Sequence, residues 1–97
     1  MKRLKNIHPG EVLLHEFLEP LGISAYRLSK DLKIPQTRTS AIIHGRRSIT
    51  ADTALRLSKY FGNSAQFWIN LQSRYDLAVV EQDIGAKVIA EVQQAAG

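Results

Sequence analysis

The chain contains no cysteine among its 97 residues, which excludes disulfides, thiol nucleophiles and zinc sites built from thiolates. It also has no apolar run near the roughly 20 residues that a membrane-spanning helix needs. The basic segment 1–5 resembles the start of a signal peptide, but no apolar stretch follows it before His8. The three histidines lack the short spacing of metal ligands, so neither a metal nor a cofactor is expected. These absences predict a soluble cytoplasmic protein that is not an enzyme.

Acidic residues are fewer than basic residues, and the two are unevenly distributed. Nine Asp and Glu stand against thirteen Lys and Arg, which gives a formal net charge of +4. Residues 1–75 hold twelve basic and five acidic residues, a net charge of +7, whereas residues 76–97 hold one and four, a net charge of −3. Residues 24–47 alone hold six basic residues and one acidic residue. A local excess of this kind is expected of a protein that binds a polyanion such as nucleic acid.

The segment 24–47 predicts two short helices joined by a tight turn. Leu28 and Leu32 recur one helical turn apart in the first helix. Pro35 disfavours a helical conformation at the residue before it and suits the first turn of a new helix, which then ends at Gly45. Two short helices around such a turn, the second of them polar, indicate a helix-turn-helix.

The second of these helices is the candidate for reading bases in the major groove of DNA. Side chains near the N-terminus of such a helix reach base edges, where Gln can pair with adenine, Arg with guanine and Thr with the methyl group of thymine. The predicted base-reading residues are Gln36, Thr37, Arg38 and Ser40. Thr39 and Ile42 should instead pack inward. The predicted phosphate contacts are Ser24, Arg27, Lys33, Arg46 and Arg47.

Periodicity in the rest of the chain predicts an all-α fold without strands. A helix is expected from Glu11 to about Glu19, closed by Pro20 and Gly22. One apolar face would hold Leu14, Phe17, Leu18 and Leu21, and Val12 and Leu13 would widen it. Its outer face is acidic and consists of Glu11, Glu16 and Glu19. That acidic face is either ordinary solvated surface or a docking surface for a basic protein.

Two further helices are expected, one after Thr50 and one after Ser64, both of which are good N-cap residues. In the second of them Phe67 and Leu71 should join the core. Its other aromatic residues are large for so small a core, so part of this face is expected to form a subunit interface. The residues predicted at that interface are Trp68, Tyr75 and Leu77.

The chain divides by composition into three parts. Residues 1–7 form a basic arm, residues 8–80 a helix-turn-helix domain and residues 81–97 an amphipathic extension. The extension carries a narrow apolar stripe on a largely acidic segment, which could dock on the body, pair with another subunit or fray.

Four phrases of the sequence resemble those of the HigA-type antitoxins, which belong to the Xre/Cro-like helix-turn-helix repressors. The phrases are His8-Pro9-Gly10-Glu11, Ala51-Asp52-Thr53-Ala54-Leu55-Arg56-Leu57, Phe61-Gly62 and Phe67-Trp68-Ile69-Asn70-Leu71-Gln72. The resemblance spans roughly residues 8–80 and implies a lambda-repressor-like domain of five helices with a short C-terminal helical extension. It also implies a homodimer that represses its own toxin–antitoxin operon by binding double-stranded operator DNA. Such a protein neutralises a cognate RelE-like, mRNA-cleaving toxin by direct binding.

A toxin that cleaves mRNA should be basic around its substrate, so the acidic residues Glu11, Glu16 and Glu19 are the candidate toxin-binding surface. The main alternative is a stand-alone Xre-type transcriptional repressor without a toxin partner, and a neighbouring gene for a small basic toxin would distinguish the two. A small enzyme or metal protein fits the sequence less well. RNA binding is also weaker, because the basic face lacks exposed aromatic residues on which single-stranded bases could stack.

Overall fold

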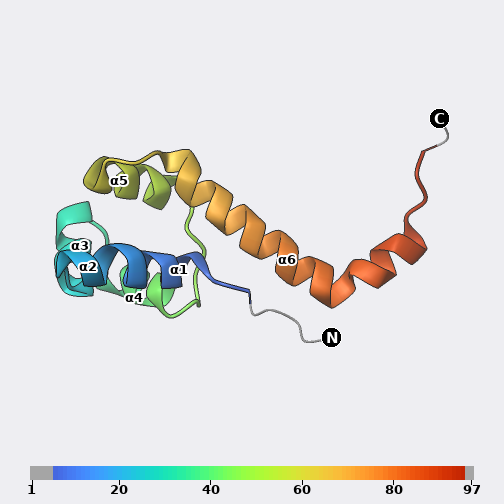
Figure 1. The fold of residues 1–97 in the computed structure, drawn as a ribbon, viewed down its shortest axis with the longest axis horizontal. Helices are drawn as coiled ribbons and strands as arrows, with labels where there is room; N and C mark the ends of the chain where they lie inside the picture. Colours follow the sequence, from blue (N-terminus) through green and yellow to red (C-terminus); the bar gives the residue numbers. More distant parts are fainter. Residues whose placement is uncertain (1–5, 96–97) are drawn as a thin grey trace.

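The computed structural model describes residues 6–95, and in that part of the chain all regular structure is helical. The elements are α1 Pro9–Val12, η1 Leu13–Leu18, α2 Glu19–Leu21, α3 Ala25–Leu32, α4 Gln36–Ile43, α5 Ala51–Phe61 and α6 Ala65–Glu91. The first three run end to end as one helix, so residues 6–95 hold five helices, as the sequence predicted (Figure 1). Residues 1–5 of the predicted basic arm lie outside the described residues. No helix within 6–95 is both long enough and apolar enough to cross a membrane.

The first helix, residues 9–21, continues past its predicted end at Glu19. Its middle part, η1, is π-helical, and the Glu19 N–H donates to the carbonyl of Leu14, five residues earlier. Pro20 follows directly, and in an α-helix its ring would clash with the carbonyl four residues before it. A π turn immediately before the proline relieves that clash, so the helix ends only at Gly22, where φ is +65°.

The π segment changes which side chains of this helix are buried. Leu18, predicted on the apolar face, and Leu13, predicted to widen that face, are both 1% exposed, whereas Leu21, predicted on the same face, is 59% exposed. The prediction assumed α-helical spacing along the whole helix. That assumption is wrong for residues 13–18, where the hydrogen bonds span five residues.

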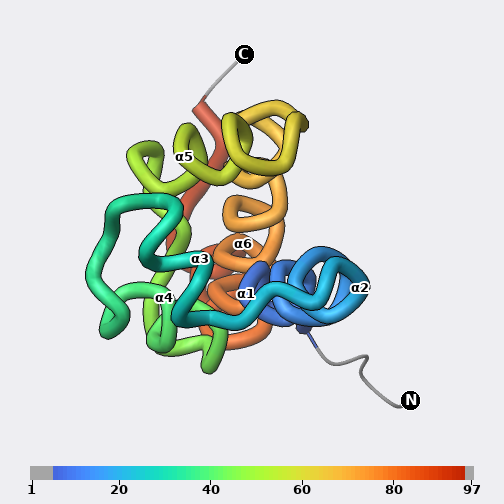
Figure 2. The backbone as a smooth tube through the Cα atoms, turned by 90° about the vertical axis from the view of Figure 1, so that its left-hand side faces the viewer, coloured from blue at the N-terminus to red at the C-terminus, as the bar shows by residue number. Residues whose placement is uncertain are grey.

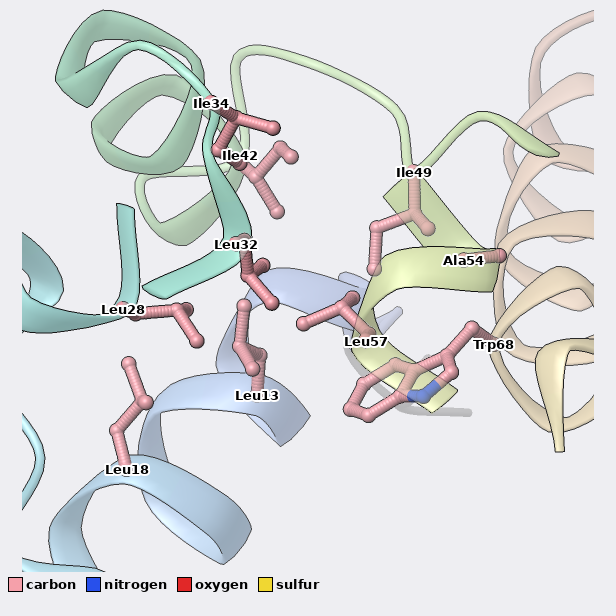
Figure 3. Close-up of a cluster of buried hydrophobic side chains, with 10 residues drawn as sticks. All are labelled: Leu13, Leu18, Leu28, Leu32, Ile34, Ile42, Ile49, Ala54, Leu57 and Trp68. Atoms are coloured by element: carbon pink, nitrogen blue, oxygen red, sulfur yellow. The ribbon is translucent and has the colours of Figure 1, made fainter. Parts of the chain in front are cut away.

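Apolar side chains from η1, α3, α4, α5, α6 and the loops before α4 and α5 form one core (Figure 3). Its buried members are Leu13, Leu18, Leu28, Leu32, Ile34, Ile42, Ile49, Ala54, Leu57 and Trp68. The Trp68 ring is 0% exposed, lies 4.9 Å from the Phe17 ring between centroids, and donates its Nε1–H to Asn63 Oδ1 at 3.0 Å. The prediction that Trp68 lies at a subunit interface is therefore corrected, because the indole fills the core of its own protomer. Phe67, expected inside, is 38% exposed.

The N-terminus of the first helix meets the end of α4 and the middle of α6 at one point. The backbone N–H of Gly10 donates to His8 Nδ1 at 2.9 Å, and the backbone N–H of His8 donates to the Glu11 carboxylate at 3.1 Å, which together form a capping box. The His8 ring packs edge-on against Tyr75 of α6, with centroids 4.8 Å apart. Burial lowers the pKa of His8, which favours the neutral ring whose nitrogen can accept this hydrogen bond. Gly10 lies directly against the carbonyl of Ile42 in α4.

Helix α6 runs well beyond the body formed by the other helices and bends where its ribbon passes from orange to red (Figure 1). The predicted boundary between residues 80 and 81 falls inside this continuous helix. The radius of gyration is 16.4 Å, against about 13 Å for a compact domain of this length, because α6 projects from the body. Apolar side chains stay exposed along the projecting part of α6 and on its C-cap residue, namely Leu77, Val79, Val80, Ile84, Val88, Ile89 and the C-cap Val92.

We expect the substitution Gly10→Ala to destabilise the fold. A Cβ at this position would overlap the carbonyl oxygen of Ile42, which is backbone and cannot rotate away. Overpacking of this kind lowers the free energy of unfolding by about 1–3 kcal/mol or more. The matched control is Gly85→Ala in α6, where the nearest atom to the new Cβ is the Glu81 Cβ at 3.9 Å. This control should raise the free energy of unfolding by about 0.5–1 kcal/mol.

Urea denaturation of both variants at one protein concentration measures the two changes. A Gly10→Ala variant as stable as the unaltered protein would contradict the close approach of the two backbones.

Candidate nucleic-acid interface

Helices α3 and α4 lie side by side and form the predicted helix-turn-helix (Figure 2). Ser24 caps α3 by accepting a hydrogen bond from the Arg27 N–H at 3.0 Å. Lys33 ends α3 in the left-handed conformation, with φ +61°. Pro35 is the N-cap of α4, and the last helical residue is Ile43, whereas the helix was predicted to stop at Gly45. The sequence signals for both helices are therefore confirmed.

A buried polar contact joins the two helices. The Ser29 hydroxyl lies 2.6 Å from Thr39 Oγ1 and 3.0 Å from the carbonyl oxygen of Ala25. Thr39 and Ile42, both predicted to pack inward, are each 1% exposed. Because buried hydroxyl groups need hydrogen-bond partners, the Ser29–Thr39 pair fixes how α4 is rotated relative to α3. Ser29 was not among the residues predicted from the sequence, although a serine can donate a hydrogen bond to the carbonyl four residues before it, here that of Ala25.

The rotation of α4 leaves its N-terminal end outward. Gln36 and Thr37, the first two helical residues, are exposed. Ser40 is half-buried, and its hydroxyl lies 3.4 Å from His44 Nδ1. Arg38 is also half-buried, with 25% of its side chain exposed. Two of the four predicted base-reading side chains are therefore fully available to a ligand, and the other two have contacts within the protein.

Arg38 belongs to an ionic network that joins three helices. Its Nη1 donates to Asp52 Oδ2 of α5 at 3.0 Å, and Arg56 Nε donates to the same carboxylate oxygen at 3.2 Å. Arg56 Nη1 also donates to the carbonyl oxygen of Leu32, the last residue of α3, at 2.9 Å. Hydrogen bonds from Arg56 and then Arg38 hold the pKa of Asp52 below its ordinary value. The Nε of Arg38 is buried and has no hydrogen-bond partner within residues 6–95.

The sequence did not predict this network, since Asp52 stood out there only as a member of one of the four phrases that resemble the HigA-type antitoxins. The i, i+4 spacing of Asp52 and Arg56 was a usable signal for one of the pairs. The contact with Arg38 spans 14 residues and depends on how α4 and α5 pack, so no local pattern encodes it.

The five predicted phosphate contacts lie at the ends of α3 and after α4. All are exposed, and they are Ser24, Arg27, Lys33, Arg46 and Arg47. Arg27 also pairs with Asp31, at 3.5 Å, on its own helix. The loop that carries Arg46 and Arg47 is fixed at its far end, where the Ile49 N–H donates to Gln72 Oε1 of α6 at 2.8 Å. Gln72 is only 5% exposed and was not identified from the sequence.

The acidic residues of the first helix differ in their exposure and in their contacts. Glu16 and Glu19 are exposed, and Glu19 pairs with His15 at 2.9 Å. Glu11 is half-buried, because its carboxylate belongs to the capping box at His8. Among residues 6–95, no group of three or more His, Asp or Glu side chains could hold a metal ion.

A family model described as helix-turn-helix matches residues 14–68. A solved structure of a HigA-family addiction module antidote protein from Coxiella burnetii is 47% identical, with a TM-score of 0.89, and the match covers 94% of this chain and 99% of that one. The chain belongs to the helix-turn-helix family, in its HigA-type branch. This branch consists of regulators and antitoxins and not of enzymes. The resemblance inferred from the four sequence phrases is thereby confirmed.

The chain is also similar to two further bacterial proteins. The Pseudomonas aeruginosa antitoxin HigA, solved with the higBA promoter, is 41% identical with a TM-score of 0.91, over 95% of this chain and 100% of that one. Virulence-associated protein I of Dichelobacter nodosus is 53% identical over 77 residues, which cover 79% of this chain and 71% of that protein.

Proposed function

We propose that this protein is a cytoplasmic DNA-binding antitoxin that represses its own toxin–antitoxin operon. The observation that carries the proposal is that the N-terminal end of α4 faces outward. Gln36 and Thr37 are exposed there, and the exposed cations Lys33 and Arg46 precede and follow them in the chain. The related Pseudomonas aeruginosa HigA was solved with promoter DNA, which supports the same use of this surface here. Helices of this type enter the major groove with their N-terminal residues against base edges.

The base-reading residues are Gln36, Thr37, Arg38 and Ser40, and the phosphate contacts are Ser24, Arg27, Lys33, Arg46 and Arg47. Gln36 suits adenine, and Arg38 suits guanine through the N–H groups that Asp52 does not occupy. Lys33 has a conformation that glycine would adopt more readily, and a lysine there adds a charge to the DNA-facing turn at a cost in backbone strain.

Replacing Gln36 or Arg46 with alanine should affect DNA binding in two different ways. Gln36→Ala should lose about 1–3 kcal/mol on the duplex upstream of this gene and relax preference at one base pair. Arg46→Ala should weaken binding equally on all duplexes and reduce the slope of log affinity against log salt by about 0.9. Lys87→Ala on α6 removes an equal charge far along the chain and serves as the control.

Fluorescence anisotropy with the upstream duplex and a scrambled duplex, each over a salt series, measures both effects. Equal losses from Gln36→Ala on the two duplexes would argue against base reading by α4.

The exposed apolar row on α6 supports a homodimer. Leu77, Val80, Ile84 and Val88 fall at intervals of three and four residues on one face and line a shared groove. We propose that the α6 helix of a second copy covers this groove, with Tyr75 and Leu77 at its inner end. A twofold dimer would place two copies of α4 on half-sites about 34–36 Å apart.

A charge placed in the apolar row should separate the two subunits. We expect Ile84→Glu to shift the protein from dimer to monomer, because a carboxylate cannot be buried there without a partner. Leu55→Glu is the matched control, since Leu55 is an exposed leucine on α5 (65% exposed) away from this row. Sedimentation equilibrium of the three proteins distinguishes the outcomes. A dimer that survives Ile84→Glu would place the subunit contact elsewhere.

The acidic face of the first helix supports a toxin-binding role. Glu11, Glu16 and Glu19 lie on a helix without Lys or Arg from residue 8 to residue 22. We propose that this face binds a RelE-like, mRNA-cleaving toxin and neutralises it, with Glu16 and Glu19 most accessible. The alternative, a stand-alone Xre-type repressor, shares the DNA surface but would have no toxin partner.

Charge reversal should separate toxin binding from DNA binding. The double substitution Glu16→Lys with Glu19→Lys should abolish co-purification of a small basic protein encoded next to this gene, while operator binding persists. Asp83→Lys with Glu91→Lys is the control, since both residues are exposed on α6 and neither lines the apolar groove. If no such neighbour exists and no partner co-purifies, the stand-alone repressor is the correct reading.

A further inference from the structure

Asp52 is an acidic residue placed within the basic DNA-facing surface. It lies in the first turn of α5, five residues after Arg47, and 56% of its side chain is exposed. A carboxylate in this position is repelled by phosphates, so by itself it opposes DNA binding. Its two contacts, with Arg38 and Arg56, are the observations that a role for Asp52 must explain.

We propose that Asp52 is a positioning and specificity-determining residue for operator recognition. It fixes the Arg38 guanidinium at the base-reading end of α4. It also keeps the charge of that guanidinium from pairing with DNA phosphates, a contact that would form on duplexes of any base sequence. This inference rests on the proposed binding of operator DNA.

The geometry of Arg38 shows why it needs an anchor. Its side chain is three-quarters covered and its Nε is buried without a partner in the described part of the chain, so the guanidinium end alone is available for directional contacts. An arginine has five N–H donors, and the bond to Asp52 uses one of them on Nη1. The donors that remain are held in a fixed plane, which bidentate pairing with a base edge requires.

The second contact of Asp52 fixes the anchor itself. Arg56 Nε donates to both carboxylate oxygens of Asp52, at 3.3 and 3.2 Å. Nη1 of the same guanidinium donates to the Leu32 carbonyl oxygen of α3. The carboxylate is therefore held from the α3 side while it orients a side chain of α4. Exposed ion pairs contribute little to folding stability, so a role in orientation accounts for this arrangement better than a role in folding.

Replacement of Asp52 should move affinity and specificity in opposite directions. Asp52→Asn keeps the shape and removes the charge, so binding to a scrambled duplex should tighten several-fold. The slope of log affinity against log salt should steepen by about 0.9, because Arg38 becomes free to neutralise one more phosphate. Discrimination at the base pair that Arg38 reads should fall by roughly 10-fold. Asp52→Glu, which keeps the charge, should retain most of that discrimination.

The experiment uses the full chain and a pool of randomised duplexes, from which the unaltered protein selects its preferred sequence. The unaltered protein and each variant are then titrated on that duplex, on its single-base-pair variants and on a scrambled duplex. Asp31→Asn is the matched control, since it removes the charge of another acidic side chain that is paired with an arginine. It should leave discrimination at every base pair unchanged. In an Arg38→Ala background, Asp52→Asn should no longer change discrimination.

Each other outcome overturns the inference. If the Asp52→Asn variant bound all duplexes more weakly by the same factor and also had a lower melting temperature, Asp52 would be a structural residue only. If Asp31→Asn lost as much base-pair discrimination as Asp52→Asn, the loss would be due to the change in net charge and not to the Asp52–Arg38 contact. Unchanged discrimination by Asp52→Asn on DNA that the protein still binds would overturn this inference alone. If the unaltered protein selects no sequence, the proposed operator binding fails as well.

Discussion

Gly10 brings the backbone of the first helix against the carbonyl of Ile42, and the position of α4 depends on that contact. Two features of the sequence support this contact. Residue 10 has no side chain, and His8 caps the helix directly beside Gly10. The His8 ring also reaches Tyr75, so the same few residues connect the first helix, α4 and α6. The buried core supplies most of the folding free energy, and this junction determines how one end of the reading helix is placed.

The other end of α4 is held by polar contacts. Ser29 and Thr39 fix its rotation against α3, and the Arg38–Asp52 pair connects it to α5. The two ends are thus fixed by different physics: close backbone packing at the C-terminal end and directional hydrogen bonds near the N-terminal end. Directional bonds are what a base-reading surface requires, because a shift of about 1 Å is enough to lose a bidentate contact.

The sequence predicted the helix-turn-helix well, because its signals are local. Pro35, the N-cap Ser24 and the terminating Gly45 each act within one turn of their own position, and both helices occur where these residues place them. The first helix was harder to predict, since a π segment before Pro20 changed the spacing of its buried side chains.

Features that depend on tertiary packing could not be read from the sequence. The position of Trp68 was predicted from its size, but the orientation of α6 against Phe17 and the first helix decides that Trp68 is inside and Phe67 outside. The Arg38–Asp52 pair joins α4 to α5 across 14 positions, and the bond from Ile49 to Gln72 joins the loop before α5 to α6 across 23 positions. Such contacts carry no periodic signal, because the partners meet only after the helices have packed.

Helix α6 contacts both parts of the molecule that orient the DNA surface. Through Gln72 it holds the loop that bears Arg46 and Arg47, and through Tyr75 it touches the His8 cap that places α4. The exposed apolar row begins immediately after these two residues, at Leu77. If a second copy covers that row, the same rigid helix sets both the separation of the two DNA surfaces and the position of the basic loop within each. Pairing of subunits and presentation of phosphate contacts would then be mechanically linked, without any change in the fold of the protomer.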